Sequence, residues 1–388
     1  MPTQTTKLSF WGVRGSTPTV DRATLRYGGN TPCLELTTPD GTRFILDCGT
    51  GLRMLGDRWT AAAGASGIDA HIFATHYHWD HIQGIPFFAP LYSPHNKFHF
   101  YSFRSDFLGR DSLKRVFEAQ MALPYFPVDL SAMSAAREFT ELAGGDRLTV
   151  GDTSVTACWL NHPQGCLGFR FDTPDGAIVY ATDNEPGRRE FDATLLEFCA
   201  GADVLINDAQ FTPEQLAGDR KGWGHSSWLE SIRLAKAAGV RQLVLFHHDP
   251  DSSDKNVDDI LRQAQSQFDN VCAAGEGMVL TMDRGHIDVA MQIAREIARR
   301  ETHFPARVAG CTPDGRAFDE ETVVSNMSVQ GAFIHLHHTP KLQSTLQVTI
   351  NGLGGTDGNQ HLVLRGYVVR LESTPGANGI GVGILFIE

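Results

Sequence analysis

The stretch THYHWDH, Thr75 to His81, sets three histidines and one aspartate within seven residues. Apolar runs lie on both sides of it, AHIFA before and IQGIPFF after. The first run predicts a β-strand that ends where the histidines begin. So dense a group of titratable side chains suits either a solvated polar loop or one half of a metal site. The other half of such a site must come from elsewhere in the chain.

The length, charge and composition of the chain limit its number of domains and the kind of partner it can bind. The chain has 388 residues with a formal net charge of −12, which argues against long nucleic acids as partners. It has no apolar run of membrane-spanning length, and its N-terminus lacks a signal-peptide pattern. The seven cysteines are scattered, as in a reducing compartment. We expect a large domain plus a smaller one, a cytoplasmic location and no membrane insertion; a homodimer stays open.

From Leu8 to about Thr281, short β-rich runs alternate with helix-like segments. The run CLGFRFDTPDGAIVYATD predicts a hairpin with its turn at TPDG. The run SSWLESIRLAKAAG predicts a helix that ends at Gly239. The segment 82–134, rich in Phe, Tyr and Pro, is typical of an insertion around a site. This part of the chain therefore predicts a mixed α/β fold.

The sequence pattern changes after the charged run DVAMQIAREIARR, residues 288–300, which predicts a helix. Short alternating runs such as TLQVTING and HLVLRGYVVRLE follow, separated by turns. They predict a small all-β domain. We therefore divide the chain into a domain over 1–286, a helical connector over 287–298 and a β-barrel domain over 299–388.

Further histidines and aspartates follow the predicted strands, namely His162, Asp183, Asp208 and His247. Strands of one layer share an edge, so these side chains can converge on the THYHWDH loop. In an extended loop alternate residues point the same way, so His76 and His78 can bind one ion. The pair Asp80 and His81 then turns toward a second position. Imidazole and carboxylate ligands suit zinc, with manganese and iron as alternatives.

Several motifs together resemble the metallo-β-lactamase superfamily, in its phosphodiesterase branch with ribonuclease Z and the phosphoribosyl cyclic phosphodiesterases. They are FWGVRGSTPT, YGGNTPCLEL, LDCGTG, THYHWDHIQG, NHP, ATD, NDAQF, GHSS and LVLFHHDP. The resemblance implies an αββα sandwich with two divalent metals and a shared hydroxide as nucleophile. The implied ligands are His76, His78 and His162 for the first ion, Asp80, His81 and His247 for the second, and Asp183 bridging both.

The motifs DAQF and GHSS resemble the stretches that assist departure of the leaving group in this branch. They imply His225 as general acid or phosphate stabiliser, oriented by Asp208. We count Asp80 with them among the catalytic residues. This pairing favours a phosphodiester over a β-lactam. A lactone or thioester hydrolase of the same fold is the alternative.

Only 20 residues separate His162 from Asp183, too few for the long arm with which ribonuclease Z grips tRNA. We therefore expect a small or cyclic phosphodiester substrate. In FHHDP we choose His247 over His248 as the ligand, because alternate residues of a strand face opposite ways. Asp47 either orients a ligand histidine or forms a turn.

The last 90 or so residues resemble a PilZ domain, a barrel known for binding cyclic di-GMP. The motif NMSVQGA matches N-x-S-x-x-G through Asn326, Ser328 and Gly331. The R-x-x-x-R motif is incomplete, because His303 stands four residues after Arg299, where the motif has its second arginine. Arg300, directly after Arg299, is a further arginine in this region. The resemblance implies regulation by cyclic di-GMP, with a degenerate barrel used for docking as the alternative. A second alternative for the whole chain is a cyclic di-GMP receptor that acts through protein contacts.

Overall fold

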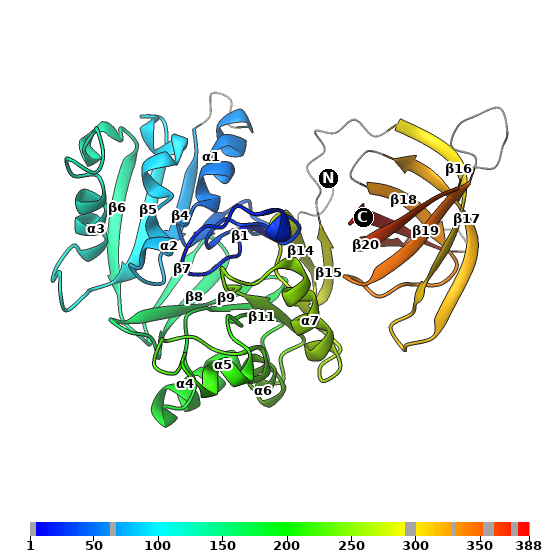
Figure 1. Cartoon of the computed structure of the whole chain (residues 1–388). Coiled ribbons are helices and arrows are strands. Elements are labelled where there is room, and N and C mark those ends of the chain that lie inside the picture. Colours follow the sequence, from blue (N-terminus) through cyan, green and yellow to red (C-terminus); the bar gives the residue numbers. More distant parts are fainter. Residues whose placement is uncertain are drawn as a thin grey trace. The chain divides into compact units, whose positions relative to one another are not determined.

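The computed structural model describes residues 5–62, 67–291, 300–327, 331–351, 361–373 and 379–387. The chain divides into two compact units, residues 1–288 and residues 289–388. Figure 1 shows both units, and each is described by itself. No helix in the described ranges is long and apolar enough to span a membrane.

Two β-sheets form the centre of the first unit (Figure 1). One sheet has the spatial order β15 (His286–Met291), β14 (Met278–Asp283), β1 (Thr6–Gly12), β2 (Cys33–Thr37), β3 (Arg43–Leu46), β4 (Asp69–Phe73), β5 (Lys97–Phe103) and β6 (Ala136–Leu142). The other has the order β13 (Val271–Ala273), β12 (Gln242–Phe246), β11 (Val204–Asp208), β10 (Gly176–Ala181), β9 (Cys166–Thr173), β8 (Thr153–Leu160) and β7 (Arg147–Val150). Strands β3 to β6 run parallel, as do β10 to β13. The polar residues that follow these parallel strands therefore meet at one edge.

Aromatic side chains join the two sheets. Phe73 packs edge-on against Phe169 and Phe171, with ring centroids 5.1 and 5.4 Å apart. Phe44 meets Phe171 at 5.5 Å. Burial of such rings between facing sheets is the main stabilising contribution of a layered core.

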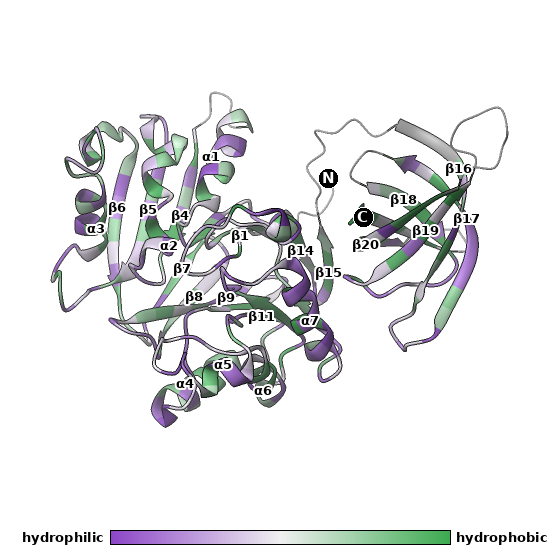
Figure 2. Ribbon diagram, in the orientation of Figure 1, coloured by the Kyte–Doolittle hydropathy of each residue, from purple (hydrophilic) through white to green (hydrophobic). Residues whose placement is uncertain are grey.

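Helices cover the outer faces of both sheets, which completes the four-layer αββα sandwich. Residues of α1 (Gly51–Ala62) and α3 (Ser112–Gln120) belong to the buried cluster of the first sheet. Residues of α4 (Arg189–Cys199), α6 (Trp228–Ala238) and α7 (Asp254–Gln265) belong to that of the second. Figure 2 shows hydrophobic residues along β11 and hydrophilic ones on α7. The short helices are α2 (Trp79–Ile82), α5 (Pro213–Ala217), η1 (Arg22–Thr24), η2 (Ile85–Phe87), η3 (Ala89–Tyr92) and η4 (Leu130–Ala132).

Two local predictions are confirmed. Strands β9 and β10 form the expected antiparallel hairpin, with Thr173 opposite Gly176. Helix α6 begins after Ser227, whose hydroxyl accepts from the Glu230 amide, and ends at Gly239. Gly239 has φ of +67°, a conformation that glycine adopts without a steric penalty.

Two other local predictions are wrong. The segment 82–134 is not only an insertion, because it contains β5, a strand of the first sheet between β4 and β6. The helical connector is also wrong over residues 287–291, which belong to β15. Arg284 and Gly285 both have positive φ, the requirement of a tight hairpin turn, so the chain returns as a strand beside β14. Residues 292–298 of the predicted connector lie outside the described residues.

The second unit contains a closed antiparallel barrel, as the sequence predicts. Its strands follow the order β16 (Arg300–Cys311), β17 (Ala317–Met327), β18 (Gly331–Leu336), β21 (Ile380–Phe386), β20 (His361–Ser373) and β19 (Thr345–Asn351). Val308, Ile334 and Ile384 are among its buried core residues.

Three of the residues predicted to bind a nucleotide lie in described strands of the barrel, namely Arg300, Asn326 and Gly331. Asn326 lies near the end of β17, and Gly331 begins β18. A Cβ at Gly331 would lie 2.2 Å from the carbonyl oxygen of Ile384, so close packing requires glycine there. Arg300 begins β16, whereas Arg299 and Ser328 lie outside the described residues.

Candidate metal centre

The ends of the strands bring the predicted site residues to one edge of the sandwich. His76 follows β4, His162 follows β8, Asp183 follows β10 and His247 follows β12. Asp80 and His81 lie in α2, which begins directly after His78. Asp183 and His247 have φ of +56° and +60°, so the chain turns sharply at both residues. Asp and His are among the residue types that tolerate this left-handed region best.

Three histidines form the first group of donors. The Nδ1 atom of His78 lies 3.0 Å from the Nε2 atom of His162. The Nε2 atom of His76 is buried without a hydrogen-bond partner in the described part of the chain. His76, His78 and His162 each offer one nitrogen to a common point.

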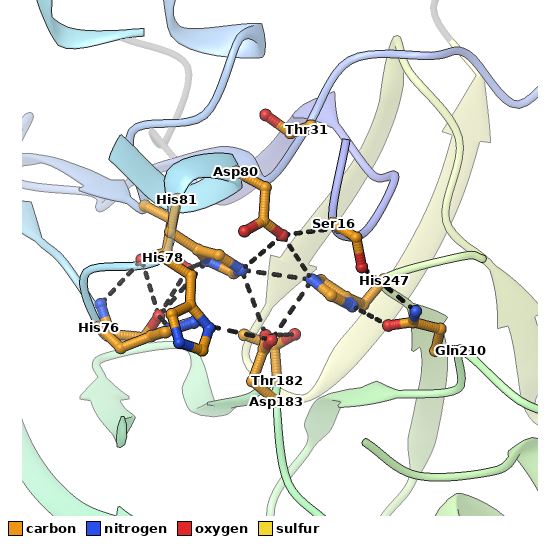
Figure 3. Close-up of polar contacts among 12 residues, drawn as sticks. Ser16, Thr31, His76, His78, Asp80, His81, Thr182, Asp183, Gln210 and His247 are labelled. Carbon is orange, nitrogen blue, oxygen red and sulfur yellow. Dashed lines mark hydrogen bonds and ion pairs between the residues drawn. The ribbon is translucent and has the colours of Figure 1, made fainter. Parts of the chain in front are cut away.

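Asp80, His81 and His247 form the second group (Figure 3). The Oδ2 atom of Asp80 lies 3.2 Å from the Nε2 atoms of both histidines. These two nitrogens lie 3.2 Å from each other. The backbone amide of Ser16 donates to the same Asp80 oxygen at 2.7 Å and so fixes the carboxylate.

Asp183 lies between the two groups. Its Oδ1 atom is 3.9 Å from the Nε2 atoms of His76 and His162. The same oxygen is 3.5 Å from Nε2 of His247, and Oδ2 is 3.4 Å from Nε2 of His81. This is the position that a ligand shared by two ions requires.

Hydrogen bonds on the far side of the rings set which nitrogen faces the centre. The Nδ1 atom of His81 donates to Asp47 at 2.8 Å, and that of His162 donates to the carbonyl oxygen of Gly224 at 2.7 Å. The Nδ1 atom of His247 donates to Oε1 of Gln210 at 3.0 Å. Each of these bonds leaves the Nε2 lone pair directed at the centre, as in metal-binding histidines.

The arrangement of the donor atoms suits bound divalent ions better than direct hydrogen bonds among the donors. Lone pairs of buried nitrogens at 3.0 to 3.2 Å repel unless a cation or a proton lies between them. Burial lowers the pKa of His162 to about 4 and that of His76 well below its usual range, so protons do not fill the first group. A mixture of imidazole nitrogen and carboxylate oxygen is typical of zinc, manganese and iron sites.

Asp47 both holds the ring of His81 and lies at a turn of the backbone. Its φ is +61°, and it is fully buried. Besides His81 it accepts hydrogen bonds from the Thr75 amide at 2.8 Å and from the Tyr180 hydroxyl at 2.7 Å. The sequence analysis missed Tyr180 and Gln210. Only Gln210 carried a signal, because it lies within the motif NDAQF.

His225 and Asp208 form a pair beside the donor groups. The Nδ1 atom of His225 donates to Oδ2 of Asp208 at 2.8 Å and lies 3.6 Å from Oδ1 of Asp183. Burial disfavours the imidazolium, but the Asp208 carboxylate outweighs it and raises the pKa of His225 to about 9. Ser227, and not His225, caps helix α6. Asp208 also accepts from the Gln210 amide at 3.0 Å, so it holds the local turn as well.

His248 points away from the centre. Its Nε2 atom donates to the carbonyl oxygen of Ala274 at 2.8 Å. Burial lowers the pKa of His248 to about 3 with a further contribution from Arg14, so the ring is neutral. Of the two neighbouring histidines, only His247 therefore faces the donors.

The fold and the donor groups together define a metal-dependent hydrolase. The chain belongs to the β-lactamase superfamily domain family, whose profile matches residues 42–248, more than half of the chain. It is 26% identical over 287 residues to a ribonuclease Z of Haloferax volcanii, a match that covers 62% of this chain and 84% of the relative. It is 25% identical over 248 residues to the probable metallo-hydrolase YhfI of Bacillus subtilis, covering 62% and 86%.

Solved structures show the same fold. The metallo-β-lactamase fold protein YhfI from Bacillus subtilis aligns with a TM-score of 0.53 at 21% identity, over 71% of this chain and 98% of that one. A diphosphatase from the PhnP family aligns with a TM-score of 0.53 at 18% identity, over 72% and 99%. These similarities concern the sandwich alone.

Proposed function

We propose that this chain is a phosphodiesterase that hydrolyses a small or cyclic phosphodiester with two divalent ions, zinc being the first choice. The observation that carries the proposal is the buried pair of His225 and Asp208, joined at 2.8 Å next to Asp183. An imidazolium at this position can protonate the oxygen of a leaving alcohol. Relatives named ribonuclease Z support a phosphodiester as the bond that is cut.

The seven clustered donors would hold the ions. His76, His78 and His162 would bind one, Asp80, His81 and His247 the other, and Asp183 both. Divalent ions in such a site supply Lewis acidity and lower the pKa of water. The chain's own contribution is to fix the donors, through Asp47, Gln210 and the Ser16 amide, and to move a proton.

The proton is held at His225. Because Nδ1 donates to Asp208, the other ring nitrogen, Nε2, is left for the substrate. His225 also lines the hollow over the donors, together with Asp80 and Asp183. An ester oxygen bound in this hollow can take the Nε2 proton as its bond to phosphorus breaks, and the alcohol leaves neutral. Without that proton the leaving group is an alkoxide, which is a far poorer one.

The size of the hollow and the length of the hairpin favour a small substrate. The hollow over the donors has a volume of about 440 Å³, within the range of small-molecule sites. The connection from β9 to β10 spans Thr173 to Gly176, so the hairpin carries no long arm. The net charge of −12 is also unfavourable for a polyanion. The cysteines are unpaired and six are buried, which supports a reducing compartment, the cytoplasm.

The decisive experiment is hydrolysis of bis-p-nitrophenyl phosphate by the full chain. We expect turnover that a chelator abolishes and that zinc, manganese or iron restores. The variant His76→Ala should lose both bound metal and turnover. A preparation with two metals per chain and no phosphodiester turnover would overturn the proposal. The lactone or thioester alternative predicts instead that His225→Ala leaves the rate on its substrate nearly unchanged.

We also propose that the barrel binds cyclic di-GMP and so regulates the hydrolase. The support is the closed six-stranded barrel together with Asn326 and Gly331 at the β17–β18 connection, where the N-x-S-x-x-G motif lies. Calorimetry with cyclic di-GMP and the full chain tests it. Saturable binding that Asn326→Ala removes supports this role, and the absence of heat from the intact chain refutes it. Binding without any effect on turnover would favour a receptor that acts through contacts.

A further inference from the structure

A second hollow adjoins the one over the donors. Its volume is about 290 Å³, and the two hollows share Tyr77, His78 and Gln164 in their walls. A ligand above the donors can therefore extend from one into the other. Their chemistry differs, because the first is lined by Asp80, Asp183 and His225 and the second is mainly apolar.

The apolar wall comes from the chain between the end of β5 and α3. Phe103, Phe107, Leu108 and Val116 line it, and Pro163 from the loop after β8 also belongs to the lining. Phe107 is 76% exposed. A large apolar side chain left exposed at the rim of a hollow is typical of a binding surface. In the described residues that line this hollow, the remaining polar groups are the hydroxyls of Ser105 and Tyr77, Gln164 and the donor histidines.

The floor of the apolar hollow is held in place. The Tyr77 hydroxyl donates to the carbonyl oxygen of Phe103, and the two rings stack at 4.8 Å. Phe103 also meets Trp159 edge-on at 5.3 Å. Tyr77 lies between the donors His76 and His78, so the same loop that carries the donors also anchors the apolar wall. A preformed surface of this kind binds a flat group with little ordering cost.

The position of His225 decides which part of a phosphodiester enters the apolar hollow. His225 lines the hollow over the donors and is absent from the described lining of the apolar one. The leaving oxygen must face His225 to receive a proton. The substituent that stays on phosphorus is then directed across His78 and Gln164, away from His225.

We propose that the apolar hollow is a subsite for the retained substituent and selects a flat aromatic group of one ring system, such as an aryl group or a nucleobase. This inference rests on the proposed phosphodiesterase function and names its substrate class. A volume of about 290 Å³ lies at the lower end of ligand sites, which suits one ring system. Phe103 and Phe107 supply faces for stacking, and Leu108 and Val116 supply apolar contact.

Two synthetic diesters test the proposal, phenyl p-nitrophenyl phosphate and methyl p-nitrophenyl phosphate. In both, water adds its oxygen to phosphorus, the bond to p-nitrophenolate breaks, and the water protons pass to solvent. Only the retained group differs, since the products are phenyl phosphate and methyl phosphate. We expect kcat/KM to be about tenfold higher for the phenyl diester, from burial of one aromatic ring. Equal kcat/KM values for the two diesters would overturn the inference.

Matched variants locate the effect. Phe107→Ser and Leu108→Ser should each reduce the ratio of kcat/KM between the phenyl and methyl diesters to about threefold or less. Tyr125→Ser is the control, because Tyr125 is an aromatic residue that follows α3, is 81% exposed and does not line the hollow. A preference that survives in both serine variants would refute this location.

A binding measurement separates this inference from the proposed function. Calorimetry with the zinc-loaded chain compares phenyl phosphate with methyl phosphate, and we expect the phenyl compound to bind about tenfold more tightly. If neither diester is hydrolysed but phenyl phosphate keeps this advantage and Phe107→Ser removes it, the phosphodiesterase proposal fails and the aromatic subsite stands. Equal binding of the two monoesters refutes the subsite whatever the turnover.

Discussion

The variant Asp208→Asn gives the sharpest test of how the leaving group is protonated. Asp208 is fully buried, and its two carboxylate oxygens accept from His225 Nδ1 at 2.8 Å and from the Gln210 amide at 3.0 Å. Asparagine keeps the shape but replaces one acceptor by an NH₂ group. In either orientation of the amide, one donor then faces another donor.

The size of the loss follows from the bond that is removed. A hydrogen bond to a buried charged group contributes about 1.5–3 kcal/mol. If this stabilises the imidazolium in the transition state, its loss lowers kcat/KM by about 10- to 150-fold. The loss is confined to substrates that need the proton. p-Nitrophenolate leaves without one, so its diester should lose no more than about threefold.

The assay compares diethyl phosphate with ethyl p-nitrophenyl phosphate, in which ethyl is the retained group and the leaving group is ethanol or p-nitrophenolate. Asp172→Asn is the control, because Asp172 pairs with Arg170 on the surface. Equal losses on both substrates would show that Asp208 has only a structural role. No loss on diethyl phosphate would refute proton donation by His225.

The pH dependence has a definite sign. His225 has its pKa raised to about 9, so its acid form is present at neutral pH and is lost as pH rises through that pKa. Activity on diethyl phosphate should therefore fall on the alkaline side. Bound cations offset the negative charges of Asp80 and Asp183, which help to raise the pKa of His225. The falling limb of the pH profile should therefore lie at or below about pH 9. In Asp208→Asn the limb should move to lower pH.

Three further predictions concern the metal centre. His247→Ala should remove about one metal ion per chain and most of the activity, whereas His248→Ala should keep the metal content and lower only the melting temperature. Elemental analysis and thermal unfolding measure these effects, and the reverse pattern would contradict our choice of His247 as the ligand. Asp47→Asn should weaken metal binding about 10- to 100-fold in a competitive chelator titration, with unchanged circular dichroism. Chelation should lower the melting temperature of the wild type, because Asp80 and Asp183 lose their counter-charges, and an unchanged melting temperature would show that metal binding does not stabilise the fold.

The donor residues could be predicted because each lies just after a strand or in the loop or short helix that follows a strand. Parallel strands of one sheet end at a common edge, and the packing of the two sheets brings their edges together, so His76 after β4 and His247 after β12 converge. Tyr180 could not be predicted in the same way. It lies inside β10, where its buried position is that of an ordinary core residue, and only the packing of the two sheets brings its hydroxyl to Asp47.

The wrong predictions have a common physical cause: whether a segment becomes a strand depends on partner strands that lie elsewhere in the sequence. The run after residue 288 has apolar residues at helical spacing, yet the turn at Arg284 and Gly285 returns the chain as a strand beside β14. Likewise, the aromatic residues of β5 read as an insertion until the neighbouring strands β4 and β6 are known. The apolar hollow could not be predicted, because Pro163 and Tyr77 in its lining are remote in sequence from Phe107.

Asp47, Asp183 and His247 all have a left-handed backbone, with φ near +60°. The side chains that hold the centre are thus also the residues that reverse the chain, and an alanine scan would measure both roles at once. Alanine adds conformational strain, of order 1–3 kcal/mol, to the loss of a donor. Asparagine and glycine tolerate the conformation, so replacements by these residues separate the two effects.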